Sequence, residues 1–367
     1  MNINDEWEKF KICNYDTDRD DDVDSIDEKI DESNLYNIEN TDNNINIPKV
    51  SDIYISTKTK IVYLNSCVDL KNIFWLIPVI PYALPIDGVI KKQIKLNSIT
   101  IEELEIIKNK LTKETYFEEY IITSINNPNG RIKFKDIRKI TIGISKKDIM
   151  NFRSKKKSAF YNCFVLILRI KVEDNFKEFH VKIFNTGKIE IPGIQKEENF
   201  QKVLSMILTT LQPYFDNKID YKENSVETVL INSNFSCGFF INREILYDIL
   251  KMKYNIQCIY DPCSYPGIQS KFYYNPDVFL QTGSQISEEN KNLYNDVSEV
   301  SFMIFRTGSV LIVGKCDEKV LNIIYDFLKI ILTNEYSKIC QKNINPNNNI
   351  IKDKKKKIRK KNITVII

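Results

Sequence analysis

The chain has 367 residues, 43% of them hydrophobic and 28% charged, and carries a net charge of +4 at pH 7. A chain of this length and hydrophobicity can bury one sizeable core or two small ones, so we expect a globular protein. Its longest apolar run, residues 73–83, is too short to cross a bilayer and contains two prolines, which argues against a membrane-spanning segment there.

The charge is unevenly distributed along the chain. Residues 1–48 are rich in aspartate and glutamate and show little apolar periodicity, so we expect a disordered acidic tail there. Residues 339–367 form a basic tail. A basic body with an acidic tail favours a polyanionic partner such as nucleic acid, although a solubilising role would explain the acidic tail as well.

The sequence offers little for catalysis or metal binding. Its eight cysteines show no CxxC spacing and no secretory signal is present, which indicates reduced thiols in an intracellular protein. His180 is the only histidine, and there is no glycine-rich phosphate-binding loop. Because a catalytic triad or a histidine-based metal site would have to be built on this one residue, we predict a protein that is not an enzyme and uses no metal or cofactor.

Taken in chain order, the first structured region spans residues 49–215. It opens with a strand, followed by a helix that Asp69 caps and Pro78 terminates. Residues 84–158 are interpreted as an inserted α/β segment, in which a capping box at residues 100–103 opens a helix.

After the insertion the pattern consists of strands and one long helix. Residues 164–172 predict an apolar strand, residues 179–191 a hairpin, and residues 197–211 a helix with its apolar residues on one stripe. The second region, residues 216–338, predicts the same succession of strand, capped helix, short strands, hairpin and long helix. Its elements are expected at residues 229–240, 243–252, 255–260, 268–274, 302–314 and 317–332.

The two hairpins carry the same motif. Residues 181–193 read VKIFNTGKIEIPG and residues 302–314 read FMIFRTGSVLIVG, so both contain Ile-Phe-x-Thr-Gly. Gly187 corresponds to Gly308 at an offset of 121 residues. A duplicated strand–turn–strand–helix unit predicts an α+β fold made of two repeats.

Alternation along the strands predicts which hairpin residues share a face. Residues equidistant from the turn oppose each other, and every second residue points to the same side. In the first hairpin this pairs Lys182 with Glu190, which we expect to form a cross-strand ion pair. In the second hairpin the same face is an apolar floor made of Met303, Phe305, Leu311 and Val313.

Three kinds of segment resemble motifs of one family. Residues 260–268, YDPCSYPGI, closely resemble the YEPELFPGL segment of TATA-binding proteins, and both hairpins resemble that family's LIFxSGK motif. Residues 232–237, NSNFSC, resemble its NIVGSC. In its divergence the chain looks most like the TATA-binding-like proteins of large DNA viruses. The resemblance implies two pseudo-symmetric repeats that form a curved antiparallel sheet, or saddle, with helices on the convex face.

The resemblance also implies which residues contact DNA. Phe184 and Phe305 correspond to phenylalanines that wedge between base steps, and Tyr265 stands at the second wedge of the second repeat. The first-repeat counterpart of Tyr265 aligns with Cys163, and Asn232 matches an asparagine that meets minor-groove acceptors. The full expected set of DNA-binding residues is Phe164, Arg169, Lys182, Phe184, Lys188, Asn232, Tyr265, Lys271, Met303, Phe305, Leu311 and Val313.

By this resemblance the chain is a monomeric transcription initiation factor that binds AT-rich promoter DNA in the minor groove, bends it and nucleates a preinitiation complex. The minor groove carries a degenerate code, so selectivity would come mainly from DNA deformability. Asp261 and Cys263 match the loop that contacts a factor IIB-like protein, and RNA polymerase is the other expected partner. The expected location is the nucleus or a cytoplasmic viral replication site, with packaging into virions left open.

Two other interpretations stay open. The chain could be an interaction scaffold that keeps the saddle but no longer bends DNA, which the carboxylate of Glu190 would favour. It could also be an architectural protein that bends AT-rich DNA without recruiting polymerase.

Overall fold

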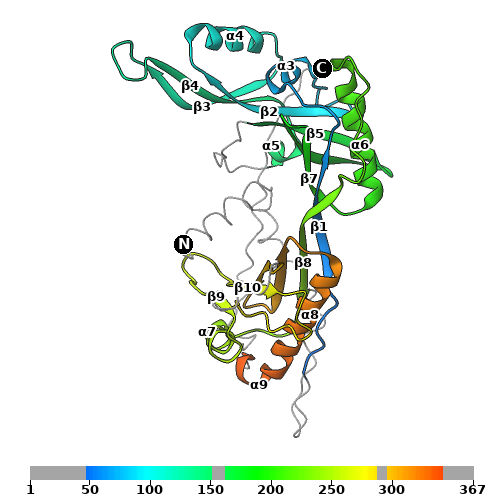
Figure 1. Cartoon of the computed structure of the whole chain (residues 1–367), viewed down its shortest axis with the longest axis vertical. Coiled ribbons are helices and arrows are strands. Elements are labelled where there is room, and N and C mark those ends of the chain that lie inside the picture. The colour runs from blue at the N-terminus through cyan, green and yellow to red at the C-terminus, as the bar shows by residue number, and fades with distance from the viewer. Residues whose placement is uncertain (1–46, 151–161, 287–295, 342–367) are drawn as a thin grey trace, which may run out of the picture. The chain divides into compact units, whose positions relative to one another are not determined.

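The computed structural model describes residues 47–150, 162–286 and 296–341 (Figure 1). The expected acidic tail lies outside these residues except for its last two positions. The last residues of the expected insertion, 151–158, and nearly all of the basic tail also lie outside the described residues. Within the described ranges, no helix is long and apolar enough to cross a membrane.

The described chain divides into two compact units. The C-terminal unit consists of residues 47–56 and 230–341, and the N-terminal unit of residues 57–229. The boundaries fall inside two strands, β1 (Tyr54–Tyr63) and β8 (Glu227–Ser236). Each unit has its own hydrophobic core.

The N-terminal unit is an antiparallel sheet with helices. Its strands lie in the order β3-β4-β2-β5-β6-β7-β1. Besides β1, its elements are α3 (Leu70–Leu76), β2 (Gly88–Ser98), α4 (Ile101–Leu111), β3 (Phe117–Asn126), β4 (Phe134–Gly143), α5 (Lys146–Met150), β5 (Cys163–Val172), β6 (Asn175–Phe184), β7 (Lys188–Ile194), α6 (Glu197–Leu211) and the 3-10 turn η2 (Gln212–Tyr214).

The core of the N-terminal unit lies on one side of this sheet. Alternate residues of β5 enter it, because successive side chains of a strand point to opposite faces. The helix α6 covers this side with a stripe at helical spacing, as the sequence predicts. The stripe consists of Phe200, Val203, Leu204, Ile207 and Leu211, all buried.

The C-terminal unit has a shorter antiparallel sheet with the strand order β8-β12-β11-β10-β9. Its first strand therefore neighbours its last, as in the order β1-β7-β6-β5-β2 of the N-terminal unit. Besides β8, its elements are α7 (Arg243–Asp248), the π-helical turn η3 (Ile249–Lys253), β9 (Gln257–Ile259), β10 (Ile268–Tyr274), β11 (Ser298–Ile304), β12 (Ser309–Gly314), α8 (Glu318–Asn334) and α9 (Tyr336–Ile339).

The helix α8 defines the core side of the C-terminal sheet. The ring of Phe327 meets that of Phe272 at 5.1 Å between centroids, and the ring of Tyr325 meets that of Phe235 at 5.0 Å. The predicted apolar stripe of α8 is buried throughout: Val320, Leu321, Ile324, Leu328 and Ile331.

The helix starts predicted from the sequence are confirmed. The side chain of Asp317 accepts a hydrogen bond from the Val320 N–H at 2.7 Å, and Asp69 caps α3 in the same way. At α4 the Thr100 hydroxyl accepts from the Glu103 N–H. The helix after Asn242 is shorter than expected, because its α-helical part ends at Asp248 and η3 continues it.

Each hairpin turn is held to the segment that follows its unit's first strand. Gly187 and Gly308 have φ angles of +80° and +82°, a region that favours glycine. A Cβ atom on these glycines would lie 2.5 Å and 2.3 Å from a carbonyl oxygen of that segment. The Leu64 N–H donates to the Gly187 carbonyl at 2.8 Å, and the Cys237 N–H donates to the Gly308 carbonyl at 2.9 Å.

Candidate nucleic-acid interface

The C-terminal sheet has one face that points away from α8, which we call the C-terminal face. The residues that alternate with the core residues along each strand line this face, and the strand register aligns them in rows. Its residues are Asn232, Asn234, Gln269, Lys271, Ser301, Met303, Leu311 and Val313.

The apolar floor expected on this face has the predicted register. Met303 lies opposite Leu311 on the adjacent strand, and Val313 lies opposite Asn232. Neighbouring side chains leave Met303 and Val313 only slightly exposed, whereas Leu311 is half-buried. The floor is therefore a packed apolar strip flanked by amide side chains.

An aromatic pair stands at the turn end of the C-terminal face. The rings of Tyr265 and Phe305 lie 5.9 Å apart between centroids and are tilted by 57°, and both residues are half-buried. Gly267 leaves them room, because a Cβ atom there would approach each ring to 3.1 Å. The structure thus brings together the two aromatic residues that the sequence assigned to the second repeat.

Two asparagines of β8 border the floor. Asn232 is half-buried, and its amide makes no side-chain hydrogen bond to any of the described residues. Asn234, which the sequence did not single out, lies two residues on and on the same face, opposite Leu311. Its Nδ2 donates a hydrogen bond of 2.8 Å to the Ser56 hydroxyl oxygen.

The remaining expected residues of the C-terminal unit lie in two places. Lys271 on the C-terminal face pairs with Glu299 at 2.9 Å. Asp261 lies in the exposed loop before β10, where its carboxylate accepts hydrogen bonds from the Ser264 hydroxyl at 2.6 Å and the Cys263 N–H at 3.1 Å. These bonds lower the pKa of Asp261. The Cys263 side chain is exposed.

In the N-terminal unit the corresponding face points away from α6, and we call it the N-terminal face. Lys182 and Glu190 lie opposite each other there, and Nζ of Lys182 lies 3.0 Å from Oε1 of Glu190, so the predicted ion pair is confirmed. Phe184 is half-buried at the turn end, and Nζ of Lys188 lies 5.5 Å from its ring centroid.

Two residues expected to contact DNA are instead structural. Phe164 is completely buried on the α6 side of β5, with its ring 6.2 Å from that of Phe74. Its position follows from strand alternation, because its neighbour Cys163 is the residue on the N-terminal face. Phe164 is therefore a core residue and not a wedge.

Arg169 is the second correction. It lies on the N-terminal face but is buried, and its guanidinium donates to the carbonyl oxygens of Tyr82 at 2.7 Å, Ile86 at 3.1 Å and Leu84. A guanidinium with these three acceptors holds the loop at residues 82–86 and is not available to a phosphate.

The segment that begins α5 covers part of the N-terminal face. Lys91 on β2 pairs with Asp148 at 2.7 Å. The Lys146 N–H donates to both carboxylate oxygens of Glu178 on β6 at 3.0 and 3.1 Å. Burial raises the pKa of Glu178, which fits a carboxylate under this segment.

The register corrects the alignment of Cys163 with Tyr265. Cys163 lies opposite Phe184 on the neighbouring strand. In the C-terminal unit Ile268 lies opposite Ile304, so the residue flanking Phe305 is Gly267. Cys163 thus corresponds to Gly267, and the position that corresponds to Tyr265 lies outside the described residues.

The register also shows a residue that the sequence did not reveal. Ile61 lies opposite Glu190 and Asn234 opposite Leu311, and both partners stand three residues after the turn glycine. Thr59 therefore corresponds to Asn232. Its hydroxyl is buried and has no hydrogen-bond partner among the described residues. Because residue 59 is a threonine and not an asparagine, the sequence alone did not single it out.

No cluster of metal-binding side chains occurs in the described parts of the chain. The C-terminal face presents apolar, amide and aromatic groups. Such a surface can bind the edges of bases in a minor groove.

Comparison with known proteins finds one curated relative and similar solved structures. No family model matches the chain. The chain is 25% identical over 206 residues to the TATA-box-binding protein-like protein of Acanthamoeba polyphaga mimivirus, a match that covers 52% of this chain and 53% of that one. The chain thus spans about half the length of this relative. Among solved structures, the TBP of Methanococcus jannaschii matches 77% of this chain and 99% of its own length, with 11% identity and a TM-score of 0.37. The resemblance to viral TATA-binding-like proteins is confirmed.

Proposed function

We propose that this chain, a divergent relative of TATA-binding proteins, binds AT-rich promoter DNA in the minor groove and bends it to nucleate a preinitiation complex. In this proposal the two units are repeats of one fold and act as the two halves of a saddle. The common strand order of the units supports the repeat. The insertion expected at residues 84–158 would then be shorter and would begin after β2, at α4, since β2 has the place in its sheet that β9 has in the other.

The observation that carries the proposal is the composition of the C-terminal face. It combines an apolar strip, the amides of Asn232 and Asn234, and the Tyr265–Phe305 aromatic pair at its end. An apolar strip suits the sugar and base edges of a widened minor groove, amides can bond the base acceptors there, and an aromatic wedge opens a base step. Unstacking costs a few kcal/mol per step, which the buried surface offsets.

The N-terminal face contributes less to DNA binding in this proposal. Its central row carries the Lys182–Glu190 pair in place of apolar residues, and α5 and the loop at residues 82–86 occupy its other end. The wedge at Phe184 and the lysine beside it, Lys188, are the groups left to engage DNA. The two halves would therefore grip DNA unequally.

The exposed Asp261 loop is the surface we assign to a factor IIB-like partner, with RNA polymerase joining the complex afterwards. Asp261 is fixed by the Ser264 hydroxyl and the Cys263 N–H, so the loop has a defined conformation before any partner binds. A preorganised loop loses less entropy on binding.

The test is end-to-end energy transfer on AT-rich and GC-rich duplexes labelled at both ends. Wild-type protein should shorten the AT-rich duplex, and Phe305→Ala should remove most of the bend. Phe279→Ala is the matched control, because Phe279 is a fully exposed phenylalanine that belongs to none of the strands of this face. Absence of bending by the wild type would favour the scaffold, and equal bending of both duplexes would favour the architectural protein.

A further inference from the structure

Asn234 is oriented by a neighbour, unlike Asn232. Its Nδ2 donates a 2.8 Å hydrogen bond to Ser56, a residue of the same unit at the start of β1. The side chain is half-buried, and its opposite neighbour across the strand pair is Leu311, which has no polar side-chain atom. The amide is thus held from one side only.

The direction of that bond decides what the side chain presents. The oxygen and nitrogen of an amide diverge from the same carbon, so an Nδ2 directed at Ser56 turns Oδ1 away from it. This oxygen makes no hydrogen bond within the described residues, and it lies beside the apolar floor. A ligand on the C-terminal face therefore meets a hydrogen-bond acceptor at this point.

A·T and G·C base pairs differ in whether their minor-groove edge has a hydrogen-bond donor for such an acceptor. Adenine N3 and thymine O2 are both acceptors, so an A·T pair in either orientation has no donor for Oδ1. The guanine N2 amino group is the donor of the minor groove. An acceptor left without a donor on binding is desolvated without compensation, which lowers affinity.

We propose that Asn234 selects a G·C base pair at one position inside an otherwise AT-rich site. The inference rests on the proposed minor-groove function and adds a readout that deformability alone would not give. Asn232, two residues away and without a fixed orientation, can still donate to the acceptors of an A·T pair. Two residues of β8 then recognise two nearby base pairs, Asn234 a G·C pair and Asn232 an A·T pair.

The experiment measures affinity for a set of duplexes at one fixed salt concentration. A single G·C pair is moved through the central positions of an AT-rich duplex, and at the best position guanine is replaced by inosine, which lacks only the N2 amino group. In a second series, adenine is replaced by 2,6-diaminopurine, which adds that group. We expect inosine to weaken binding about tenfold and diaminopurine to strengthen it at the same position.

Two variants assign the effect to this amide. Asn234→Ala should bind guanine and inosine duplexes equally, while Asn322→Ala, which removes an exposed asparagine of α8, should keep the wild-type ratio. Ser56→Ala should reduce the ratio, because the amide is then free to turn. If Asn234→Ala fails to fold, the inosine and diaminopurine ratios of the wild type decide the question.

The possible failures are distinguishable. If the wild type binds and bends AT-rich duplexes but treats guanine and inosine alike at every position, the function stands and the role of Asn234 is wrong. A preference for inosine that Asn234→Ala abolishes would show that Nδ2 faces the groove, which also overturns the inference. If no duplex is bound, both proposals fail.

Discussion

Lys182 and Glu190 lie directly opposite each other on β6 and β7, with 3.0 Å between Nζ and Oε1. The equivalent positions of the C-terminal unit are Met303 and Leu311. One hairpin face therefore has a charge pair where the other is apolar. This difference sets the first prediction.

Removal of the carboxylate should strengthen DNA binding. Glu190→Gln removes a negative charge that repels phosphates from the face proposed to meet DNA, so affinity should rise about fivefold to tenfold at low salt. The slope of log affinity against log salt should become steeper by about one. A titration at several salt concentrations measures both, and Glu198→Gln on α6 is the control on the opposite side of the sheet. Unchanged affinity and slope would show that this face does not meet DNA.

Arg169→Ala should affect stability and leave the DNA salt slope unchanged. The side chain is buried, and its loss removes a donor from three carbonyl oxygens, of which that of Leu84 keeps the bond from the Ile86 N–H. The loss should lower the free energy of unfolding by about 3 kcal/mol. Arg169→Lys should rescue little, since an ammonium cannot reproduce the planar fork. Urea unfolding measures the loss, and Lys188→Ala is the contrast, with little loss of stability and a slope reduced by about one. A lower salt slope for Arg169→Ala would mean that Arg169 does contact a phosphate.

Substitution of two phenylalanines of the N-terminal unit should have different effects, one on the stability of the fold and the other on DNA bending. Phe164→Ala removes a completely buried ring and should cost about 3–5 kcal/mol of unfolding free energy. Phe184→Ala removes a half-buried ring at the turn end, so its cost should be below about 1.5 kcal/mol while DNA bending decreases. Thermal melting and energy transfer on the same samples check the contrast. Equal destabilisation by both would place Phe184 in the core as well.

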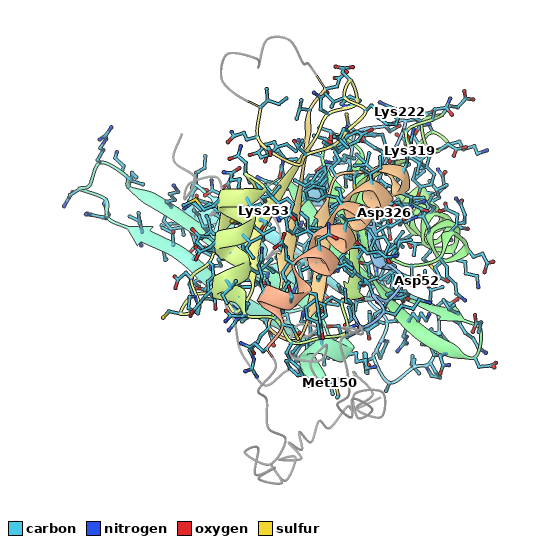
Figure 2. The ribbon with its side chains drawn as sticks, turned by 90° about the horizontal axis from the view of Figure 1, so that it is seen from below. Asp52, Met150, Lys222, Lys253, Lys319 and Asp326 are labelled. Atoms are coloured by element: carbon cyan, nitrogen blue, oxygen red, sulfur yellow. The ribbon has the colours of Figure 1, made fainter. Side chains whose placement is uncertain are left out.

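Glu335 should make the C-terminal unit sensitive to acid. Its buried carboxylate accepts hydrogen bonds from Lys253, from the Tyr254 hydroxyl at 2.9 Å and from Lys338 at 3.2 Å, and Lys253 is marked in Figure 2. The bond from Lys253, followed by the other two, lowers the pKa of Glu335 to about 2. Because the folded-state pKa lies below the ordinary value, this stabilisation is present above about pH 4.5 and is lost as the pH falls toward 2.

The variant Glu335→Gln tests this. At pH 7 it should be less stable than the wild type by about 2 kcal/mol, and the difference should shrink below about pH 4.5. Denaturant unfolding from pH 7 to pH 3 measures the difference, with the exposed Glu244→Gln as control. A difference that stays constant over this range would mean that the ionised carboxylate is not the stabilising form.

Local features of the fold were predictable from sequence, because local patterns determine them. The cap at Asp317, the stripe of α6 and the register of Met303 with Leu311 all follow from spacing over a few residues. The candidate site was predictable only in part. The strand at Phe164 was found, but a run of apolar residues on both faces did not reveal which face was the core.

Contacts between segments that are distant in the chain could not be predicted from the sequence. The acceptors of Arg169 lie more than eighty residues before it, and the link from Lys146 to Glu178 joins α5 to β6. Nothing in the neighbourhood of these residues signals such partners. The bond between Asn234 and Ser56 spans 178 residues and was equally hidden.

The attachment of the hairpin turns is made by main-chain atoms. The carbonyl oxygens of Gly187 and Gly308 accept from backbone N–H groups, so the attachment requires glycine at the turn and nothing specific from the partner side chains. The phenylalanine three residues before each glycine also belongs to this main-chain arrangement, because its carbonyl oxygen accepts the N–H of that glycine. The main-chain support of the proposed wedges at Phe184 and Phe305 is therefore independent of most side chains of the two hairpins, whose sequences differ at many positions.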